Sequence, residues 1–196
     1  MRPRKQGLGY RIWNQTRLAM HVDSYLQIYQ ELHGNNSREG WPASVGAVLS
    51  TTYHVLFQSI LINLDMINDK SKGSVSLYRL LSEAKEEQFV TDAEYASLKS
   101  RLDRHATVLS NIGRQRNNLI AHRSEKQSFA KIKADYPIAT PDLVALARDY
   151  YEVAKELHHK VPFNTAWELN DLRTGTREII GALDAKYAGL VRAGMA

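Results

Sequence analysis

The residues best suited to chemistry lie in one short segment, residues 114–123. It contains Arg116, followed by two asparagines, and then His122. Cleaving RNA without a metal requires a group that carries a proton near neutral pH and a fixed cation that stabilises charge building on the phosphate. Histidine supplies the first, and the planar guanidinium of arginine supplies the second. The segment therefore predicts ribonuclease chemistry, in which the ribose 2′-hydroxyl attacks its own phosphate and leaves a 2′,3′-cyclic phosphate.

The neighbouring residues extend this prediction to substrate binding. We expect Arg116 and His122 to be catalytic and Asn117 to support them. Residues 99–123 carry many basic side chains and a single acid, Asp103, and this excess favours a polyanionic partner such as RNA. A solvated helix surface is the simpler explanation for the part of this excess before residue 105. The predicted RNA-binding residues are Arg104, Arg114, Asn118 and Arg123.

Helix geometry constrains how Arg116 and His122 could meet. On one ideal helix, two residues six positions apart lie about 120° apart around the axis and about 9 Å along it. Either the helix unwinds near Ala121, or a homodimer axis brings one pair from each subunit into a shared site, which is the arrangement we favour. Asn118 lies on the same helix face as His122 and could orient its ring, while Asn117 faces the phosphate.

The same residues also admit non-catalytic interpretations. His122 could act only as an imidazolium at a helix C-terminus, where the helix dipole favours positive charge. Arg116 could serve only to bridge two subunits. The protein would then be a helical dimer that binds a partner protein or nucleic acid. A third hypothesis is a nucleotide-binding accessory protein that works beside a separate nucleotidyltransferase.

Helical periodicity dominates the chain and predicts an all-α fold, an up-and-down antiparallel bundle of about five to six helices. Thr91 and Glu94 form a capping-box pattern, and Thr140 and Pro141 form a helix start. The segment 123–139 is long for a loop and is either functional or partly helical. The predicted helices cover about residues 10–33, 41–68, 75–87, 91–121 or 122, 140–161 and 176–193.

Composition excludes several classes of site. The chain of 196 residues has no cysteine, so disulfides, thiolate zinc sites and cysteine nucleophiles are ruled out. No histidine pair has the spacing of a zinc protease, and we predict neither a metal nor a cofactor. Polar residues interrupt the apolar stretch 55–64, and the basic N-terminus lacks the apolar region of a signal peptide. We therefore expect no membrane span and a cytoplasmic location.

Arg116-Asn117, four intervening residues and His122 resemble the motif of the HEPN superfamily: an arginine, a polar residue, four to six further residues and a histidine. Residues 121–123 are similar to the abortive-infection branch of that superfamily in bacteria. So are the acid-containing helix end at 64–69 and the leucine-rich segment 76–81. The likeness covers about residues 10–159.

This resemblance implies a HEPN-like helical bundle that forms homodimers and cleaves RNA without metal as a toxin or phage-defence effector. It also implies a cognate antitoxin or nucleotidyltransferase as a further partner, although many HEPN proteins are inactive scaffolds. We divide the chain into a basic flexible N-terminus (1–9), a HEPN-like helical core (10–161) and a C-terminal extension (162–196) whose terminal helix packs on the core.

Overall fold

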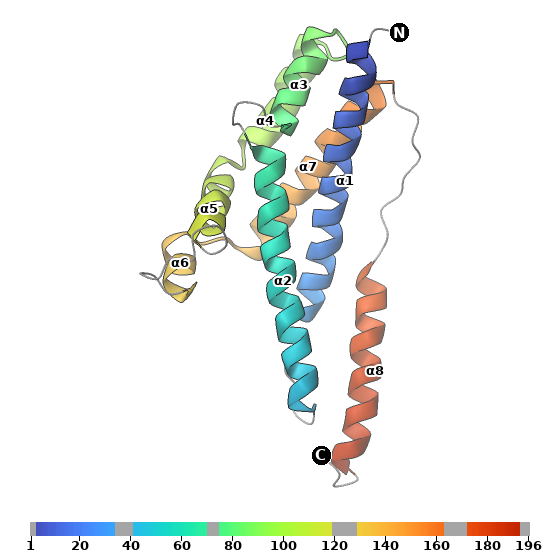
Figure 1. The fold of residues 1–196 in the computed structure, drawn as a ribbon, viewed down its shortest axis with the longest axis vertical. Coiled ribbons are helices and arrows are strands. Elements are labelled where there is room, and N and C mark those ends of the chain that lie inside the picture. The colour runs from blue at the N-terminus through green and yellow to red at the C-terminus, as the bar shows by residue number, and fades with distance from the viewer. Residues whose placement is uncertain (1–2, 34–40, 70–74, 119–128, 163–171, 193–196) are drawn as a thin grey trace. The chain divides into compact units, whose positions relative to one another are not determined.

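The computed structural model describes residues 3–33, 41–69, 75–118, 129–162 and 172–192 (Figure 1). Within these ranges the secondary structure is helical, and the predicted all-α class is confirmed. There are more helices than the five to six predicted. The α-helices in the described ranges are α1 (Pro3–Leu32), α2 (Ala43–Asn68), α3 (Leu77–Glu86), α4 (Asp92–Asp103), α5 (Ala106–Arg116), α6 (Phe129–Asp135), α7 (Thr140–Lys160) and α8 (Leu172–Arg192).

A break at Arg104 and His105 divides the helix that was predicted to run from residue 91 to 121 or 122. The His105 N–H bonds to the Leu102 carbonyl in a tight turn at 3.3 Å, and α5 begins directly afterwards. Both side chains at the break reach the Asp149 carboxylate on α7, with His105 Nε2 2.5 Å and Arg104 Nε 2.7 Å from Oδ2. The prediction of one continuous helix was wrong, because a partner far along the chain holds the break.

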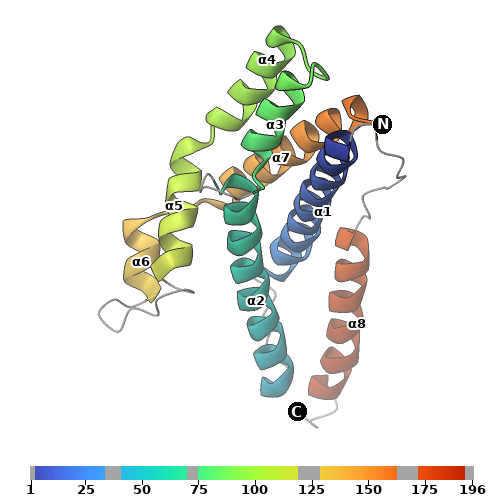
Figure 2. The same cartoon turned by 45° about the horizontal axis from the view of Figure 1, so that its top comes forward.

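The segment 123–139, left undecided by the sequence, is partly helical. It contains α6, whose Ile132 side chain is buried, and α6 lies beside α5 in both views (Figure 1 and Figure 2). The structure has more helices than predicted because this segment contains α6 and because the break divides one predicted helix into α4 and α5.

Other helix boundaries depend on capping. Thr91 Oγ1 accepts the Glu94 N–H, and Glu94 Oε2 accepts the Thr91 N–H, so the predicted capping box is confirmed. Thr140 is the first residue of α7 rather than its cap, and the cap residue, Ala139, provides no side-chain hydrogen bond.

At the N-terminus, α1 begins at Pro3 instead of near residue 10, and Leu8 is fully buried. The predicted division into N-terminus, helical core and C-terminal extension, with boundaries at residues 9 and 161, stays a prediction.

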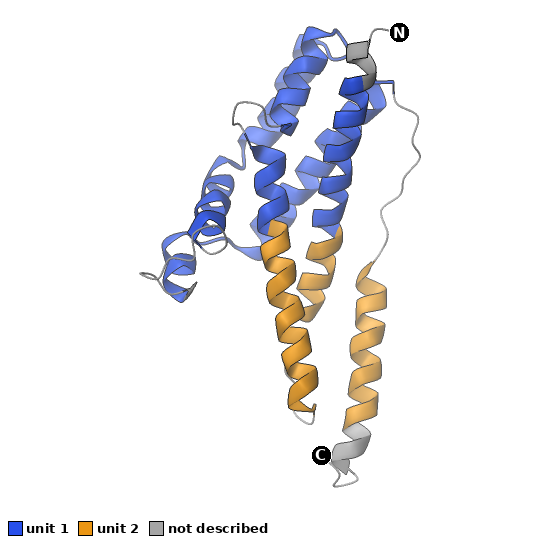
Figure 3. Ribbon diagram, viewed as in Figure 1, with its two compact units in different colours: residues 1–23, 61–167 blue, residues 24–60, 168–196 orange. Residues whose placement is uncertain are grey.

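The chain forms two compact units (Figure 3). Unit 1 comprises residues 1–23 and 61–167, and in it α3, α4 and α7 pack against one another (Figure 2). Its described core is made mostly of aliphatic side chains that are removed from solvent, which favours the folded state by the hydrophobic effect. The largest fully buried side chains in this unit are Leu8, Ile12, Leu61, Leu64, Ile67, Leu77, Leu80, Leu81, Leu102, Ile112 and Tyr150.

Unit 2 comprises residues 24–60 and 168–196. Tyr29 and Tyr53 stack with ring centroids 4.4 Å apart, and their hydroxyls are joined by a 2.6 Å hydrogen bond. Polar contacts fasten α8 in this unit: Arg177 binds both oxygens of Glu31, at 2.8 and 2.7 Å, and Trp41 Nε1 donates to Asp184 at 3.1 Å. Among the described side chains of α8, Ile180 is buried.

Helix α2 is long and apolar enough to cross a membrane, judged by length and composition alone. Residues 43–64 contain no Asp, Glu, Lys or Arg, although polar side chains interrupt them. A core helix of a soluble protein passes the same test when it is mostly buried, whereas 22% of the apolar stretch of α2 is buried, with Ile60, Leu61 and Leu64 among its fully buried residues. The absence of a membrane span stays a prediction from the sequence.

The contacts of Asp149 make a testable contribution to stability. Burial alone would raise the pKa of Asp149, but the hydrogen bonds from Arg104 and His105 outweigh burial and hold it below its usual value. A lowered folded-state pKa stabilises the fold above the unfolded-state pKa of about 4, and this contribution is lost as the pH falls further. Asp149→Asn should lower the free energy of unfolding by about 1–3 kcal/mol at neutral pH.

Urea denaturation followed by circular dichroism measures this loss. The difference between Asp149→Asn and the parent should narrow as the pH is lowered below about 4. Glu178→Gln, which removes an exposed carboxylate on α8, should match the parent throughout. A deficit for Asp149→Asn that is the same at pH 3 and pH 7 would contradict the interpretation.

Candidate functional site

Arg116, the last residue of α5, is held by oxygen atoms on two sides. Its Nη1 donates to Asn117 Oδ1 at 3.0 Å and lies 3.6 Å from Asp65 Oδ2 on α2. At 3.6 Å, the contact between Arg116 and Asp65 is an ion pair rather than a hydrogen bond. The Arg116 side chain remains 40% exposed. A guanidinium has five N–H donors, so this one is oriented by the protein while still accessible to an anion.

Asp65 meets α5 at Gly113, one turn before the end of the helix. A Cβ atom on Gly113 would lie 3.5 Å from Asp65 Oδ1, an ordinary van der Waals contact, so this carboxylate lies directly against the helix. Asp65 follows the fully buried Leu64, which fixes its place on α2. Two helices of unit 1 thus bring an acid to the predicted catalytic arginine.

Burial raises the pKa of Asp65 above its usual value, the positive charge of Arg116 opposes the rise, and the negative charge of Asp69 adds to it. Burial and the neighbouring cation therefore act on the pKa of Asp65 in opposite directions. The sequence prediction did not assign Asp65 a role. The sequence does place this acid directly after the buried residues of a core helix. It gives no sign of the pairing, because Arg116 lies far along the chain.

The two asparagines after Arg116 have structural roles in this arrangement. Asn117 continues the α-helical backbone, with φ −64° and ψ −43°, and its N–H bonds to the Gly113 and Arg114 carbonyls. The Asn118 side chain donates to the same Arg114 carbonyl at 2.8 Å. The α-helical geometry assumed for the spacing of the motif therefore holds through Asn117.

The remaining predicted residues are not all brought together. Arg114 is exposed and lies over the Tyr136 ring, 5.3 Å from its centroid. Arg104 lies before the start of α5 and is bound to Asp149, so α5 separates it from Arg116. His122 and Arg123 lie outside the described residues.

Acids on α4 and α7 accompany the basic residues before α5. Lys99 pairs with Asp103 at 2.5 Å, and Arg101 pairs with Glu156 on α7. Together with the Arg104–Asp149 pair, these contacts offset the local positive charge. Near the motif, the positive charge that these acids do not offset is therefore carried by Arg114 and Arg116 at the C-terminal end of α5.

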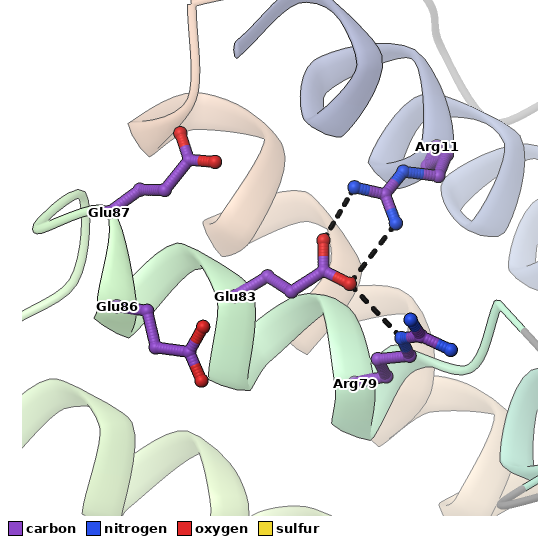
Figure 4. Close-up of a pocket in the computed structure, with 5 residues that line it drawn as sticks. All are labelled: Arg11, Arg79, Glu83, Glu86 and Glu87. Carbon is purple, nitrogen blue, oxygen red and sulfur yellow. Dashed lines mark hydrogen bonds and ion pairs between the residues drawn. The ribbon is translucent and has the colours of Figure 1, made fainter. Parts of the chain in front are cut away.

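A pocket of about 500 Å³ lies elsewhere in unit 1, between α1 and α3 (Figure 4). At its centre Glu83 accepts hydrogen bonds from Arg11, at 3.1 and 2.5 Å, and from Arg79, at 3.1 Å. Burial would raise the pKa of Glu83, but these guanidinium groups lower it below its usual value. Glu86 and Glu87 complete the lining. None of the predicted site residues lines this pocket, and its central charges are already paired with each other.

Comparison with known proteins gives one match. The family model HEPN_AbiU2, described as AbiU2, matches residues 10–179, which is most of the chain and includes both Asp65 and the segment 114–123. Searches of curated proteins and of solved structures found no match.

The coupling between Asp65 and Arg116 predicts the direction of a titration shift. Because the cation lowers the Asp65 pKa, Arg116→Gln should raise it further, and Asp69→Asn should lower it by removing a repelling charge. Carboxyl ¹³C NMR titration of the folded protein measures both shifts. Arg114→Gln, two residues away on the same helix, is the matched control and should leave the Asp65 titration nearly unchanged. An unaltered Asp65 pKa in Arg116→Gln would show that the two groups are not coupled.

Proposed function

Because this chain belongs to the HEPN_AbiU2 family, we propose that it is a metal-independent endoribonuclease that acts as a toxin or phage-defence effector. The observation that carries the proposal is the guanidinium of Arg116. Asn117 and Asp65 orient it, and it is accessible at the end of α5. Preorganised donors aimed at developing charge are the largest catalytic contribution in many enzymes.

In the proposed reaction, Arg116 pairs with the non-bridging oxygens of the scissile phosphate. His122 relays the proton that leaves the ribose 2′-hydroxyl as the 2′-oxygen attacks phosphorus. The bond from phosphorus to the 5′-oxygen breaks, and that oxygen takes up a proton. The products are a 2′,3′-cyclic phosphate on one fragment and a free 5′-hydroxyl on the other. Asn117 supports the reaction by accepting a hydrogen bond from Arg116.

The proposed active unit is a homodimer in which each subunit contributes one copy of the arginine and histidine to a shared site. RNA is its substrate. A toxin requires restraint in the cell that makes it, so a cognate antitoxin or a nucleotidyltransferase is the proposed further partner.

Purified protein should cleave RNA in the presence of EDTA. His122→Ala and Arg116→Ala should each reduce the cleavage rate by about 10²-fold or more, because each removes a proton carrier or a charge stabiliser from the transition state. Gel electrophoresis of a labelled RNA measures the rate, and far-UV circular dichroism should show an unchanged fold. Arg148→Ala, which removes an exposed arginine from α7, is the matched control and should keep full activity.

Two outcomes would contradict this function. Cleavage that EDTA abolishes would point to a metal-dependent reaction. Absence of cleavage in the parent, together with loss of the dimer in His122→Ala, would support the non-catalytic helical scaffold instead. End-group analysis of the fragments provides an independent check, since the proposed reaction leaves a cyclic phosphate that mild acid opens.

A further inference from the structure

Two side-chain amides of α5 fasten the chain segment that follows α6. Gln115 Nε2 donates to the Tyr136 carbonyl at 2.6 Å, and Asn111 Nδ2 donates to the Pro137 carbonyl at 2.9 Å. Gln115 is only 1% exposed, so the first of these bonds is shielded from water. The two donors lie one helical turn apart and bind consecutive carbonyls. The backbone of Tyr136 is therefore fixed beside the last turn of α5.

This anchoring places the Tyr136 ring against Arg114. The guanidinium carbon lies 5.3 Å from the ring centroid, within the range of a cation–π interaction. Arg114 is exposed and Tyr136 is partly exposed, so the pair lies at the surface. Arg114 lies two residues before Arg116, about 200° away around an ideal helix, so the two guanidinium groups leave different sides of α5. The result is a positively charged aromatic surface on the last turn of α5, on another side of the helix from the proposed catalytic arginine.

Helix α6 adds to the positive charge of this region. Lys131 is exposed, and Lys133 is partly buried, with burial lowering its pKa. Within the described residues 111–118 and 129–136 the sequence has one acid, Asp135, and Asp65 on α2 pairs with Arg116. Positive charge combined with an aromatic surface is typical of proteins that bind single-stranded nucleic acid.

We propose that Arg114, Tyr136, Lys131 and Lys133 form a binding surface for unpaired RNA near the C-terminal end of α5. One base stacks on the Arg114–Tyr136 pair, and the lysines neutralise neighbouring phosphates. The strand is unpaired because a base inside an A-form duplex is stacked on its neighbours and cannot lie on a protein ring. That the bound strand is also the substrate rests on the proposed ribonuclease function, whereas binding itself does not.

Binding can be measured without cleavage. The probe is a short fluorescein-labelled 2′-O-methyl RNA of mixed sequence, which lacks the attacking hydroxyl, and fluorescence anisotropy of the full-length protein gives the Kd. Tyr136→Ala should weaken binding about tenfold, and Tyr136→Phe should restore it, because base stacking requires the ring and not the hydroxyl. A duplex of the same sequence should bind more weakly and should not respond to Tyr136→Ala.

The chain offers a matched control. Lys85 Nζ lies 4.7 Å from the centroid of the Tyr95 ring on α4, another partly exposed cation–π pair. Tyr95→Ala should leave RNA binding unchanged. The double variant Lys131→Gln and Lys133→Gln should lower the slope of log Kd against log salt by about one to two, because each phosphate contact releases counterions.

The outcomes separate this inference from the proposed function. Weaker binding by Tyr136→Ala in a parent that cleaves no RNA would support the surface and contradict the ribonuclease. A parent that cleaves RNA, together with unchanged RNA binding by Tyr136→Ala, would support the ribonuclease and contradict the surface. Equal affinity for duplex and single strand would overturn the inference. If Tyr136→Ala does not fold, Arg114→Gln and the double lysine variant provide the same test, and unchanged binding in both would overturn it.

Discussion

The arrangement of unit 1 depends on the Asp149 carboxylate, which binds both residues at the break between α4 and α5. Removing a carboxylate from water is unfavourable unless donors replace the lost hydration, and Arg104 and His105 provide those donors only where the helix is interrupted. An unbroken helix would carry residues 106–116 along the axis of α4. The break instead sets the course of α5, and α5 carries Asn111, Arg114, Gln115 and Arg116. The contact of Asp65 with this helix and the anchoring of Tyr136 both follow from that course.

The positive charge at the end of α5 is partly balanced by the Asp65 carboxylate. A cation at a helix C-terminus is favoured by the helix dipole, and the Asp65 carboxylate stabilises Arg116 further. Their separation of 3.6 Å and the 40% exposure of Arg116 keep this ion pair weak. In the proposed reaction, a phosphate competes with Asp65 for the same guanidinium. A weak ion pair serves that exchange well, because it orients the side chain without preventing it from binding the substrate.

Local sequence signals predicted local structure. The capping box at Thr91 and the proline at the start of α7 act on neighbouring residues, and both were found where expected. The break at His105 could not be predicted this way, since Leu98, Leu102, Leu109 and Ile112 continue one apolar stripe across it. Its cause, Asp149, is 44 residues away in the chain. The pairing of Asp65 with Arg116 and the position of Tyr136 likewise depend on tertiary contacts. The candidate arginine and its neighbour Asn117 could therefore be named from the sequence, whereas Asp65 could not.

The backbone after Arg116 also bears on how the motif assembles. The separation of about 120° and about 9 Å assumes a continuous α-helix from residue 116 to 122. Asn117 keeps that geometry, with φ −64° and ψ −43° and an N–H that bonds to the Gly113 carbonyl. The spacing argument for a twofold axis therefore keeps its premise at the first residue after the arginine. The proposed homodimer rests on this spacing together with the resemblance to HEPN proteins, and unwinding near Ala121 is the other route for bringing histidine to arginine.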